Sequence, residues 1–257
     1  MKRHSTLFLL CGLLCLLMAA QEGVALGEVV VAGDEKNALA LKRQQMVKEA
    51  LLKAGIQDQR VLKAMATVPR HAFVAKEFLE SAYENHPLPL CCGQTISQPF
   101  IVAYMIEMAN LKPQSRVLEI GTGCGYNAAV LSRVCRRVYS LEIHQALHQK
   151  AKQTLSGLGY HNIELALKDG ADGWPDAAPF DAILSTAAST FVPQSWQDQL
   201  KEGGCLIMPL EASDGEQYLW RFTKVRGDPP AFKKEKLLAV RFVPLLRSQK
   251  NVQRSGR

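Results

Sequence analysis

The segment from Val117 to Tyr126, whose sequence is VLEIGTGCGY, constrains the fold of this chain more than any other stretch. A short apolar run ends there in three glycines at alternate positions, Gly121, Gly123 and Gly125, and a helical pattern follows. Glycine is needed where the backbone turns sharply and approaches a ligand without a Cβ atom in the way. The segment therefore predicts a strand, a tight turn and a helix, with a ligand bound beyond the carboxyl end of the strand.

The segments on either side of this turn alternate between strand and helix patterns. Helices are expected at residues 38–66, interrupted at Gly55, and at 101–111, 128–134, 144–158 and 194–200. Strands are expected at 117–120, 137–141, 163–167, 180–185 and 205–209, followed by two strand-like segments at 217–224 and 237–242. Alternating strands and helices indicate parallel pairing, whereas the last two segments, which have no helix between them, indicate an antiparallel pair. The sequence thus predicts an α/β fold, a Rossmann-like three-layer sandwich with a mostly parallel seven-stranded sheet, a C-terminal antiparallel pair and N-terminal helices.

Three acidic residues stand at the ends of three successive predicted strands. Glu119 lies two positions before the first glycine, Glu142 ends the next strand, and Asp169 follows the third. A carboxylate at the end of the second strand can accept hydrogen bonds from both hydroxyls of a ribose. A carboxylate after the third strand is placed to meet an adenine amino group. The pattern resembles the class I S-adenosylmethionine-dependent methyltransferases, with Glu142 in the place of their ribose-binding acid.

Several other ligands are disfavoured by the same residues. The glycine spacing is G-x-G-x-G rather than the dinucleotide-binding G-x-G-x-x-G, and the loop has no phosphate-binding lysine. The formal net charge is +7, but the basic residues are scattered, and no Pro-Pro-aromatic motif follows the fourth strand. No nucleic-acid partner is therefore expected. No metal is expected either, because the chain has no C-x-x-C spacing and the pair His144 and His148 has no third ligand.

A second group of motifs lies in an irregular, proline-rich segment upstream of the turn. Residues 87–99 have the sequence PLPLCCGQTISQP and are preceded by Val68-Pro69-Arg70. Together with the glycine turn and the later segment from Val240 to Leu245, these motifs resemble the protein-L-isoaspartate O-methyltransferases. That family carries V-P-R, P-L-P and G-Q-T-I-S-x-P in the same order. The resemblance extends from about Met46 to Leu246.

Four positions depart from the pattern of that family. Cys91 and Lys168 replace glycines, Cys124 replaces a serine, and Ser185 stands where valine is common. Cysteine is nearly isosteric with serine, so the turn is expected to tolerate Cys124. Lys168 could bring a positive charge to the adenine end of the site and so alter the affinity for the cofactor.

The resemblance implies a repair enzyme that methylates the free α-carboxylate of L-isoaspartyl residues in damaged proteins and peptides, with S-adenosyl-L-methionine as the cofactor. The methyl ester then collapses to a succinimide, whose hydrolysis partly restores normal aspartate. Ser97 is the expected active-site serine, with Gln94 and Gln217 also at the substrate. A helix that starts near Pro99 offers Ser97 a second role, as its cap. The residues expected to bind the cofactor are Thr95, Ile96, Glu119, Gly121, Thr122, Gly123, Gly125, Glu142, Asp169 and Gly170.

Two alternative functions stay open on the sequence alone. One is a methyltransferase that uses the same cofactor on another substrate, and the other is a catalytically inactive cofactor-binding module. The expected partners are proteins and peptides that contain isoaspartate, and the chain is expected to act as a monomer.

The N-terminus has the pattern of a secretory signal peptide. Basic residues at positions 2 and 3 precede an uncharged apolar run over residues 7–20, and small residues before Leu26 provide a cleavage site. The run is shorter than the roughly 20 residues of a membrane span, so no stable span is expected after cleavage. The predicted organisation is a signal peptide at 1–25, a lead-in at 26–45, a methyltransferase domain at 46–246 and a basic tail at 247–257. Export, to a periplasm, is expected; translation from Met46 would instead give a cytoplasmic protein.

Overall fold

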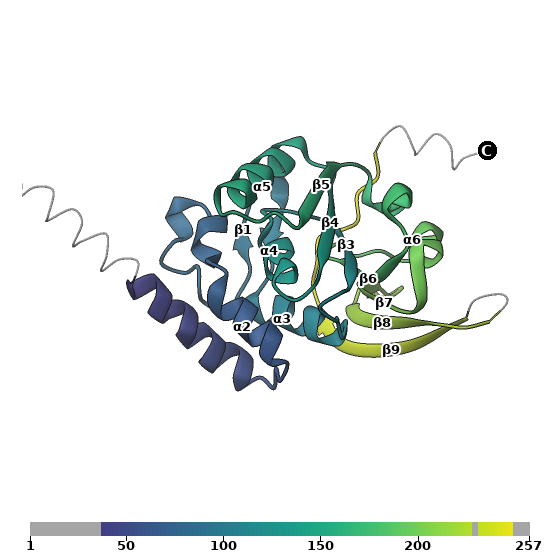
Figure 1. The fold of residues 1–257 in the computed structure, drawn as a ribbon, viewed down its shortest axis with the longest axis horizontal. Helices are drawn as coiled ribbons and strands as arrows, with labels where there is room; N and C mark the ends of the chain where they lie inside the picture. Colours follow the sequence, from purple (N-terminus) through teal and green to yellow (C-terminus); the bar gives the residue numbers. More distant parts are fainter. Residues whose placement is uncertain (1–36, 228–230, 249–257) are drawn as a thin grey trace, which may run out of the picture. The chain divides into compact units, whose positions relative to one another are not determined.

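The computed structural model describes residues 37–227 and 231–248 (Figure 1). The predicted signal peptide and most of the predicted basic tail lie outside these residues. Backbone contacts divide the chain into one unit that ends at Lys42 and a second that begins at Arg43. In the first unit residues 37–42 are α-helical, and the sheet belongs to the second unit.

The second unit is built on a seven-stranded sheet with the strand order β5-β4-β3-β6-β7-β8-β9. The strands are β3 (Arg116–Ile120), β4 (Arg137–Glu142), β5 (Ile163–Leu167), β6 (Phe180–Ser185), β7 (Leu200–Glu211), β8 (Gln217–Val225) and β9 (Ala231–Val240). Pairing is parallel from β5 through β7 and antiparallel from β7 through β9. The prediction of a mostly parallel sheet with a C-terminal antiparallel pair is therefore confirmed.

Helices cover both faces of this sheet, which makes three layers (Figure 1). The helices are α2 (Gln59–Thr67), α3 (Pro99–Met108), α4 (Tyr126–Ser132), α5 (Gln145–Gly157) and α6 (Gln194–Gln199), with a π-helical stretch η1 (Val47–Leu52). Short 3-10 turns are η2 (Arg70–Phe73), η3 (Lys76–Phe78), η4 (Cys91–Gly93), η5 (Gly170–Asp172) and η6 (Pro175–Ala177). In Figure 1 α4 and α5 lie on one side of the sheet and α6 lies on the other.

The central strand β3 sets the position of the glycine turn. Val117, Leu118 and Ile120 are buried on both faces of the sheet, as expected for an apolar strand between parallel neighbours. Every residue of α4 is also buried, from Tyr126 to Ser132. The turn between β3 and α4 is thus held from both sides at the carboxyl edge of the sheet.

Several local features differ from the sequence-based expectations, among them the start of β7 at Leu200 rather than at residue 205. The strand β9 begins six residues earlier than expected, because the segment around Lys233 and Glu235 is a charged edge strand without an apolar alternation. The helix expected over residues 38–66 ends its first part as the π-helical η1 before the turn at Gly55. The segment expected to be irregular contains a small antiparallel pair, β1 (Leu88–Pro89) and β2 (Thr95–Ile96).

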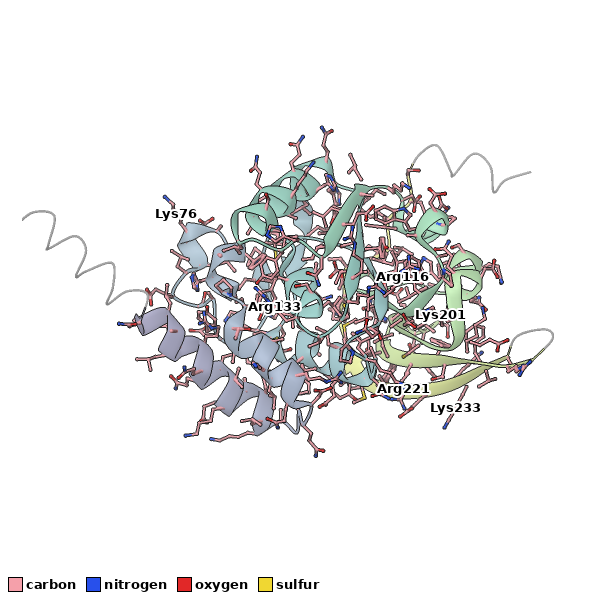
Figure 2. All side chains as sticks on the ribbon, viewed as in Figure 1. Lys76, Arg116, Arg133, Lys201, Arg221 and Lys233 are labelled. Carbon is pink, nitrogen blue, oxygen red and sulfur yellow. The ribbon has the colours of Figure 1, made fainter. Side chains whose placement is uncertain are left out.

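The positive charge is distributed over several elements. The basic side chains labelled in Figure 2 belong to different strands, turns and helix ends. Two of them form ion pairs: Lys201 lies 2.7 Å from Asp181, and Arg221 pairs with Glu235. Among the described residues no helix is both long and apolar enough to cross a membrane.

Candidate cofactor and substrate site

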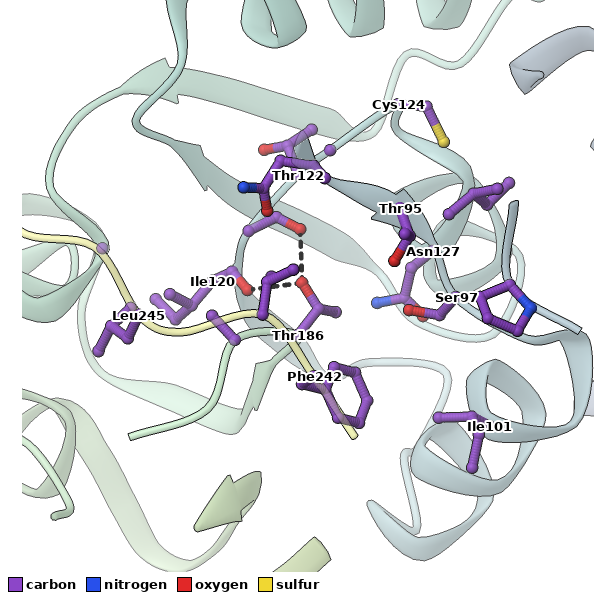
Figure 3. A pocket seen from close by; sticks show the side chains of 18 of the residues that line it. Thr95, Ser97, Ile101, Ile120, Thr122, Cys124, Asn127, Thr186, Phe242 and Leu245 are labelled. Atoms are coloured by element: carbon purple, nitrogen blue, oxygen red, sulfur yellow. Dashed lines mark hydrogen bonds between the residues drawn. The ribbon is translucent and has the colours of Figure 1, made fainter. Parts of the chain in front are cut away.

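A cavity of about 480 Å³ lies at the carboxyl ends of β3, β4 and β6 (Figure 3). Its wall combines the glycine turn, the segment from Gln94 to Gln98, and the segment from Ala239 to Leu246. The volume is in the range of small-molecule sites. The sequence-predicted site residues in its wall are Gln94, Thr95, Ile96, Ser97, Gly121, Thr122, Gly123, Glu142 and Gly170.

The glycine turn approaches the cavity with a backbone that other residues rarely adopt. Gly121, Gly123 and Gly125 all have positive φ angles, of 91°, 55° and 92°. A Cβ atom on Gly121 would lie 2.5 Å from Oγ1 of Thr186, which leaves no room for it. A Cβ atom on Gly125 would lie 3.0 Å from Leu155, so this last glycine serves the packing of the turn against α5. Gly125 is accordingly not in the cavity wall, although the sequence placed it among the cofactor-binding residues.

Glu142 faces the cavity with its carboxylate fixed by the backbone. One oxygen accepts a hydrogen bond from the Gly123 N–H at 2.7 Å, and the other accepts from the N–H groups of Ile143 and His144, both at 2.9 Å. These bonds hold the side chain in one orientation without a neighbouring cation. Of its roughly four lone-pair sites, one on Oε2 is therefore left for a hydroxyl donor in the cavity.

Glu119 lies behind the cavity wall, whereas the sequence placed it in contact with the cofactor. It is fully buried, and its oxygens accept hydrogen bonds from Nδ2 of Asn127 at 2.6 Å and from the Ser140 hydroxyl. The Ser140 hydroxyl in turn lies 2.6 Å from that of Thr122, which does line the cavity. Burial raises the pKa of Glu119 to about 7, although the bonds from Ser140 and Asn127 act in the opposite direction. Glu119 therefore supports the turn from within.

Asp169 also lies outside the cavity wall, while its neighbour Gly170 is part of it. One oxygen of Asp169 accepts from the Ala171 N–H at 3.0 Å, and the other accepts from Nε of Arg247 at 3.1 Å and the Ser248 N–H at 2.8 Å. Burial raises the pKa of Asp169, but these hydrogen bonds and the Arg247 charge outweigh it and hold the pKa below its usual value. The residue expected to meet adenine instead anchors the C-terminal segment.

Ser97 lines the cavity between β2 and α3, and it does not cap the helix. The helix α3 begins at Pro99, its N-cap residue is Gln98, and no side chain makes a capping hydrogen bond. The alternative role of Ser97 as a cap is therefore wrong. The fixed φ of proline starts this helix without help from a serine. In Figure 3 Ser97 and Thr95 point into the same end of the cavity.

Gln217 acts through its neighbour rather than in the cavity wall. Its Oε1 accepts from the Phe242 N–H at 2.7 Å, and its Nε2 donates to the Phe242 carbonyl at 3.3 Å and to Glu211 at 2.9 Å. Phe242 lines the cavity. Gln217 therefore lies close to the cavity, but its side chain supports the wall residue Phe242 and does not line the cavity itself.

Three residues of the site have roles that the sequence did not indicate. Asn127 lines the cavity, and the Thr186 hydroxyl bonds the carbonyls of Ile120 and Gly121 at 3.1 and 2.8 Å. Arg241 lines the cavity as well. The only sequence signal was position, since Asn127 follows the turn directly and Thr186 follows β6. The hydrogen-bond partners of Asn127 and Thr186 cannot be derived from sequence spacing.

Lys168 and Cys124, two of the residues that depart from the family pattern, have defined surroundings in the structure. The Lys168 ammonium lies 5.0 Å from the ring centre of Trp174, a cation–π contact outside the cavity wall. Burial raises the pKa of the Cys124 thiol to about 11, so the thiol is protonated at neutral pH. All five cysteines of the described residues are free, and these residues contain no cluster of metal-ligating side chains.

The family model of the protein-L-isoaspartate(D-aspartate) O-methyltransferases matches residues 41–250. The chain belongs to this family. It is 50% identical over 208 residues to a protein-L-isoaspartate O-methyltransferase of Opitutus terrae, covering 81% of this chain and 88% of that protein. It is 52% identical over 198 residues to the one of Parvibaculum lavamentivorans, covering 76% of this chain and 88% of that protein.

Solved structures of the same family have the same fold. One protein-L-isoaspartate O-methyltransferase superposes with a TM-score of 0.72 at 34% identity, over 79% of this chain and 65% of that longer chain. Another, a Plasmodium falciparum chain described as belonging to the family, was solved with S-adenosyl-L-homocysteine. It superposes with a TM-score of 0.70 at 26% identity, over 80% of this chain and 99% of that chain.

This family is dependent on S-adenosyl-L-methionine, and the residues of the cavity fit that cofactor. The Glu142 carboxylate, which faces the cavity, suits a hydroxyl of the ribose. The apolar side chains of Ile120, Leu245 and Leu246 suit an adenine ring. A Cβ atom at Gly170 would come within 2.5 Å of Ile120 and would disturb that wall.

Proposed function

We propose that this protein is a repair enzyme that transfers a methyl group from S-adenosyl-L-methionine to the free α-carboxylate of L-isoaspartyl residues in damaged proteins and peptides. The observation that carries the proposal is a single cavity that joins Ser97 of the G-Q-T-I-S-x-P motif to the glycine turn and Glu142. The relatives at 50% and 52% identity are named protein-L-isoaspartate O-methyltransferases, which supports the proposal.

The chemistry requires little from the side chains beyond position. The substrate carboxylate is already ionised at neutral pH. The bound cofactor supplies a methyl group that is already activated as a sulfonium. Ser97 donates its hydroxyl proton in a hydrogen bond to the carboxylate and aligns it, while Ile101 and Phe242 exclude water from the same cavity. No general base is needed, which agrees with the neutral character of the residues around Ser97.

Paired peptides test the proposal directly. The purified protein is mixed with cofactor labelled on its methyl group and with two peptides that differ only in isoaspartate or aspartate. A base-labile label is expected on the isoaspartyl peptide alone. Label on neither peptide, with cofactor binding intact, would favour the inactive binding module. Label on another substrate class would favour a different methyltransferase.

Replacing Ser97 by alanine tests the assigned role. Loss of one hydrogen bond to a charged group is expected to lower kcat/KM about tenfold to a hundredfold while the Kd of the cofactor stays unchanged. The matched control is Ser156→Ala, an exposed serine on α5, which is expected to leave both constants unchanged. Weaker cofactor binding in Ser97→Ala would place this serine in the cofactor site instead.

The compartment and the oligomeric state belong to the same proposal. The signal-peptide pattern of residues 1–25 supports export, with a mature chain that starts near Leu26 and acts as a monomer. N-terminal sequencing of the natural protein checks the first point, since a chain that starts at Met46 would contradict it. Sedimentation of the purified protein checks the second.

A further inference from the structure

Only one of the two polar atoms of the Asn127 side chain has a hydrogen-bond partner among the described residues. It is 8% exposed and lines the cavity. Its Nδ2 donates a hydrogen bond to Oε1 of Glu119 at 2.6 Å. Its Oδ1 is buried and has no hydrogen-bond partner among the described residues. A buried acceptor without a partner is unfavourable and rare in native proteins, which calls for a functional explanation.

The orientation of this amide is fixed by Glu119. If the amide were turned over, Oδ1 would face a carboxylate oxygen of Glu119 at 2.6 Å, and two acceptors would oppose each other. In its ionised form the Glu119 carboxylate therefore selects the orientation that keeps Nδ2 inside. Oδ1 is the atom left for a ligand, and it can bind only a hydrogen-bond donor.

The neighbouring backbone carbonyls of Ile120 and Gly121 are already engaged as acceptors. The Thr186 hydroxyl donates to the carbonyls of Ile120 and Gly121. In contrast to these two carbonyls, Oδ1 of Asn127 has no donor among the described residues. The Glu119 carboxylate behind it polarises the amide, so a positively charged donor is favoured over a neutral one.

We propose that Oδ1 of Asn127, backed by Glu119, accepts a hydrogen bond from the α-ammonium group in the methionine part of the cofactor. The inference rests on the proposed function. Figure 3 shows Asn127 at the same end of the cavity as Thr95 and Ser97, whereas Leu245 lies at the other end. Only a short alkyl chain separates the ammonium from the sulfonium. The contact therefore positions the methyl group beside the carboxylate that Ser97 orients.

Two ligands and two variants test this role by calorimetric binding, without turnover. S-adenosyl-L-homocysteine carries the α-ammonium, and 5′-methylthioadenosine has the same nucleoside and thioether without the amino-acid part. Asn127→Leu keeps the approximate shape but has no acceptor. It is expected to weaken S-adenosyl-L-homocysteine binding about tenfold to a hundredfold and to leave 5′-methylthioadenosine binding within twofold of the wild type.

Asn127→Asp provides the conservative rescue. Two carboxyl groups at hydrogen-bond distance share one proton, so the pair with Glu119 keeps its internal bond and leaves an acceptor oxygen toward the cavity. This variant is expected to bind S-adenosyl-L-homocysteine within about threefold of the wild type. A loss as large as that of Asn127→Leu would overturn the proposal, because it would show that the amide matters only for the shape of the turn.

Further outcomes separate this inference from the proposed function. Equal losses of both ligands in Asn127→Leu, or no loss of either, would overturn the inference alone. Failure of the wild-type protein to bind either ligand would overturn both. Methylation of aspartyl rather than isoaspartyl peptides, with the ligand-selective loss intact, would overturn only the proposed substrate.

Discussion

At the residue scale, the acidic side chains show what sequence spacing can and cannot predict. Glu142 ends its strand in the predicted place and faces the cavity. Glu119 and Asp169 also stand where expected, but their partners come from other elements. Asp169, for example, binds Ser248, which is 79 positions further along the chain. Strand ends follow from local apolar patterns, whereas the choice between facing a ligand and supporting a wall depends on these distant contacts.

The raised pKa of Glu119, about 7, predicts a pH dependence of stability in the ligand-free protein. Folding favours the protonated form, so stability is highest below the ordinary glutamate pKa and falls as the pH rises through about 7. Glu119→Gln removes this titration, and its amide can still bond both Asn127 and Ser140. The free energy of unfolding in urea, measured from pH 5 to pH 9, is expected to decline less steeply in the variant. An equal decline in both proteins would assign the titration to another group.

Gly121 permits a prediction about the turn with an internal control. An alanine there would combine a φ of +91° with a Cβ atom 2.5 Å from Thr186, whereas Gly203 has a φ of +72° and open space. Gly203→Ala is expected to cost about 1 kcal/mol of unfolding free energy through backbone strain alone. Gly121→Ala is expected to cost a further 1–3 kcal/mol, approximately, from the steric conflict. Equal losses in the two urea titrations would show that the neighbouring threonine moves aside without cost.

At the element scale, the C-terminal segment shows why pairing cannot be read from local patterns. The Leu245 N–H donates to the Ala188 carbonyl at 2.7 Å, and the Ala188 N–H donates to the Val243 carbonyl at 2.8 Å. The domain boundary predicted at residue 246 therefore falls inside a bonded segment that continues to Arg247 and Ser248. The parallel strands were predictable because each is a buried apolar run. This segment, like the short pair of β1 and β2, is defined by partners far away in the sequence.

Arg247 is expected to tighten cofactor binding through this segment. It pairs with the buried Asp169 at 3.1 Å and with the exposed Asp172 at 3.3 Å, next to Leu245 and Leu246 of the cavity wall. Arg247→Ala is expected to raise the Kd of S-adenosyl-L-homocysteine about twofold to tenfold, because a partly exposed pair contributes modestly. The difference should shrink at high salt.

The control for charge alone is Arg226→Ala, an exposed arginine after β8. It is expected to leave the affinity unchanged at low and high salt. An equal effect of both substitutions would attribute the result to the net charge of the protein and not to the anchoring of the C-terminal segment.

At the scale of the whole molecule, the fold class and the alternation of strands and helices were predictable from the sequence, and the start of the domain stays a prediction. The sequence put the domain boundary at Met46. In the structure Arg43 belongs to the larger unit, where its Nε donates to the Ala66 carbonyl at 2.7 Å. A chain that starts at Met46 would lose this bond, and the buried Met46 would become its terminal residue. The position of the true N-terminus is therefore expected to affect the free energy of unfolding as well as the compartment of the protein.

Two forms of the protein, starting at Leu26 and at Met46, allow this to be measured. Loss of a partly buried hydrogen bond from a charged group is worth about 1.5 kcal/mol, which corresponds to a Tm lower by roughly 3 to 6 °C in the shorter form. Arg43→Ala in the longer form is the matched control and should reproduce most of that difference. If Arg43→Ala leaves the Tm unchanged while the truncation lowers it, the stabilisation comes from other residues between Leu26 and Gln45. An unchanged Tm in both would show that a cytoplasmic form starting at Met46 is as stable as the exported one.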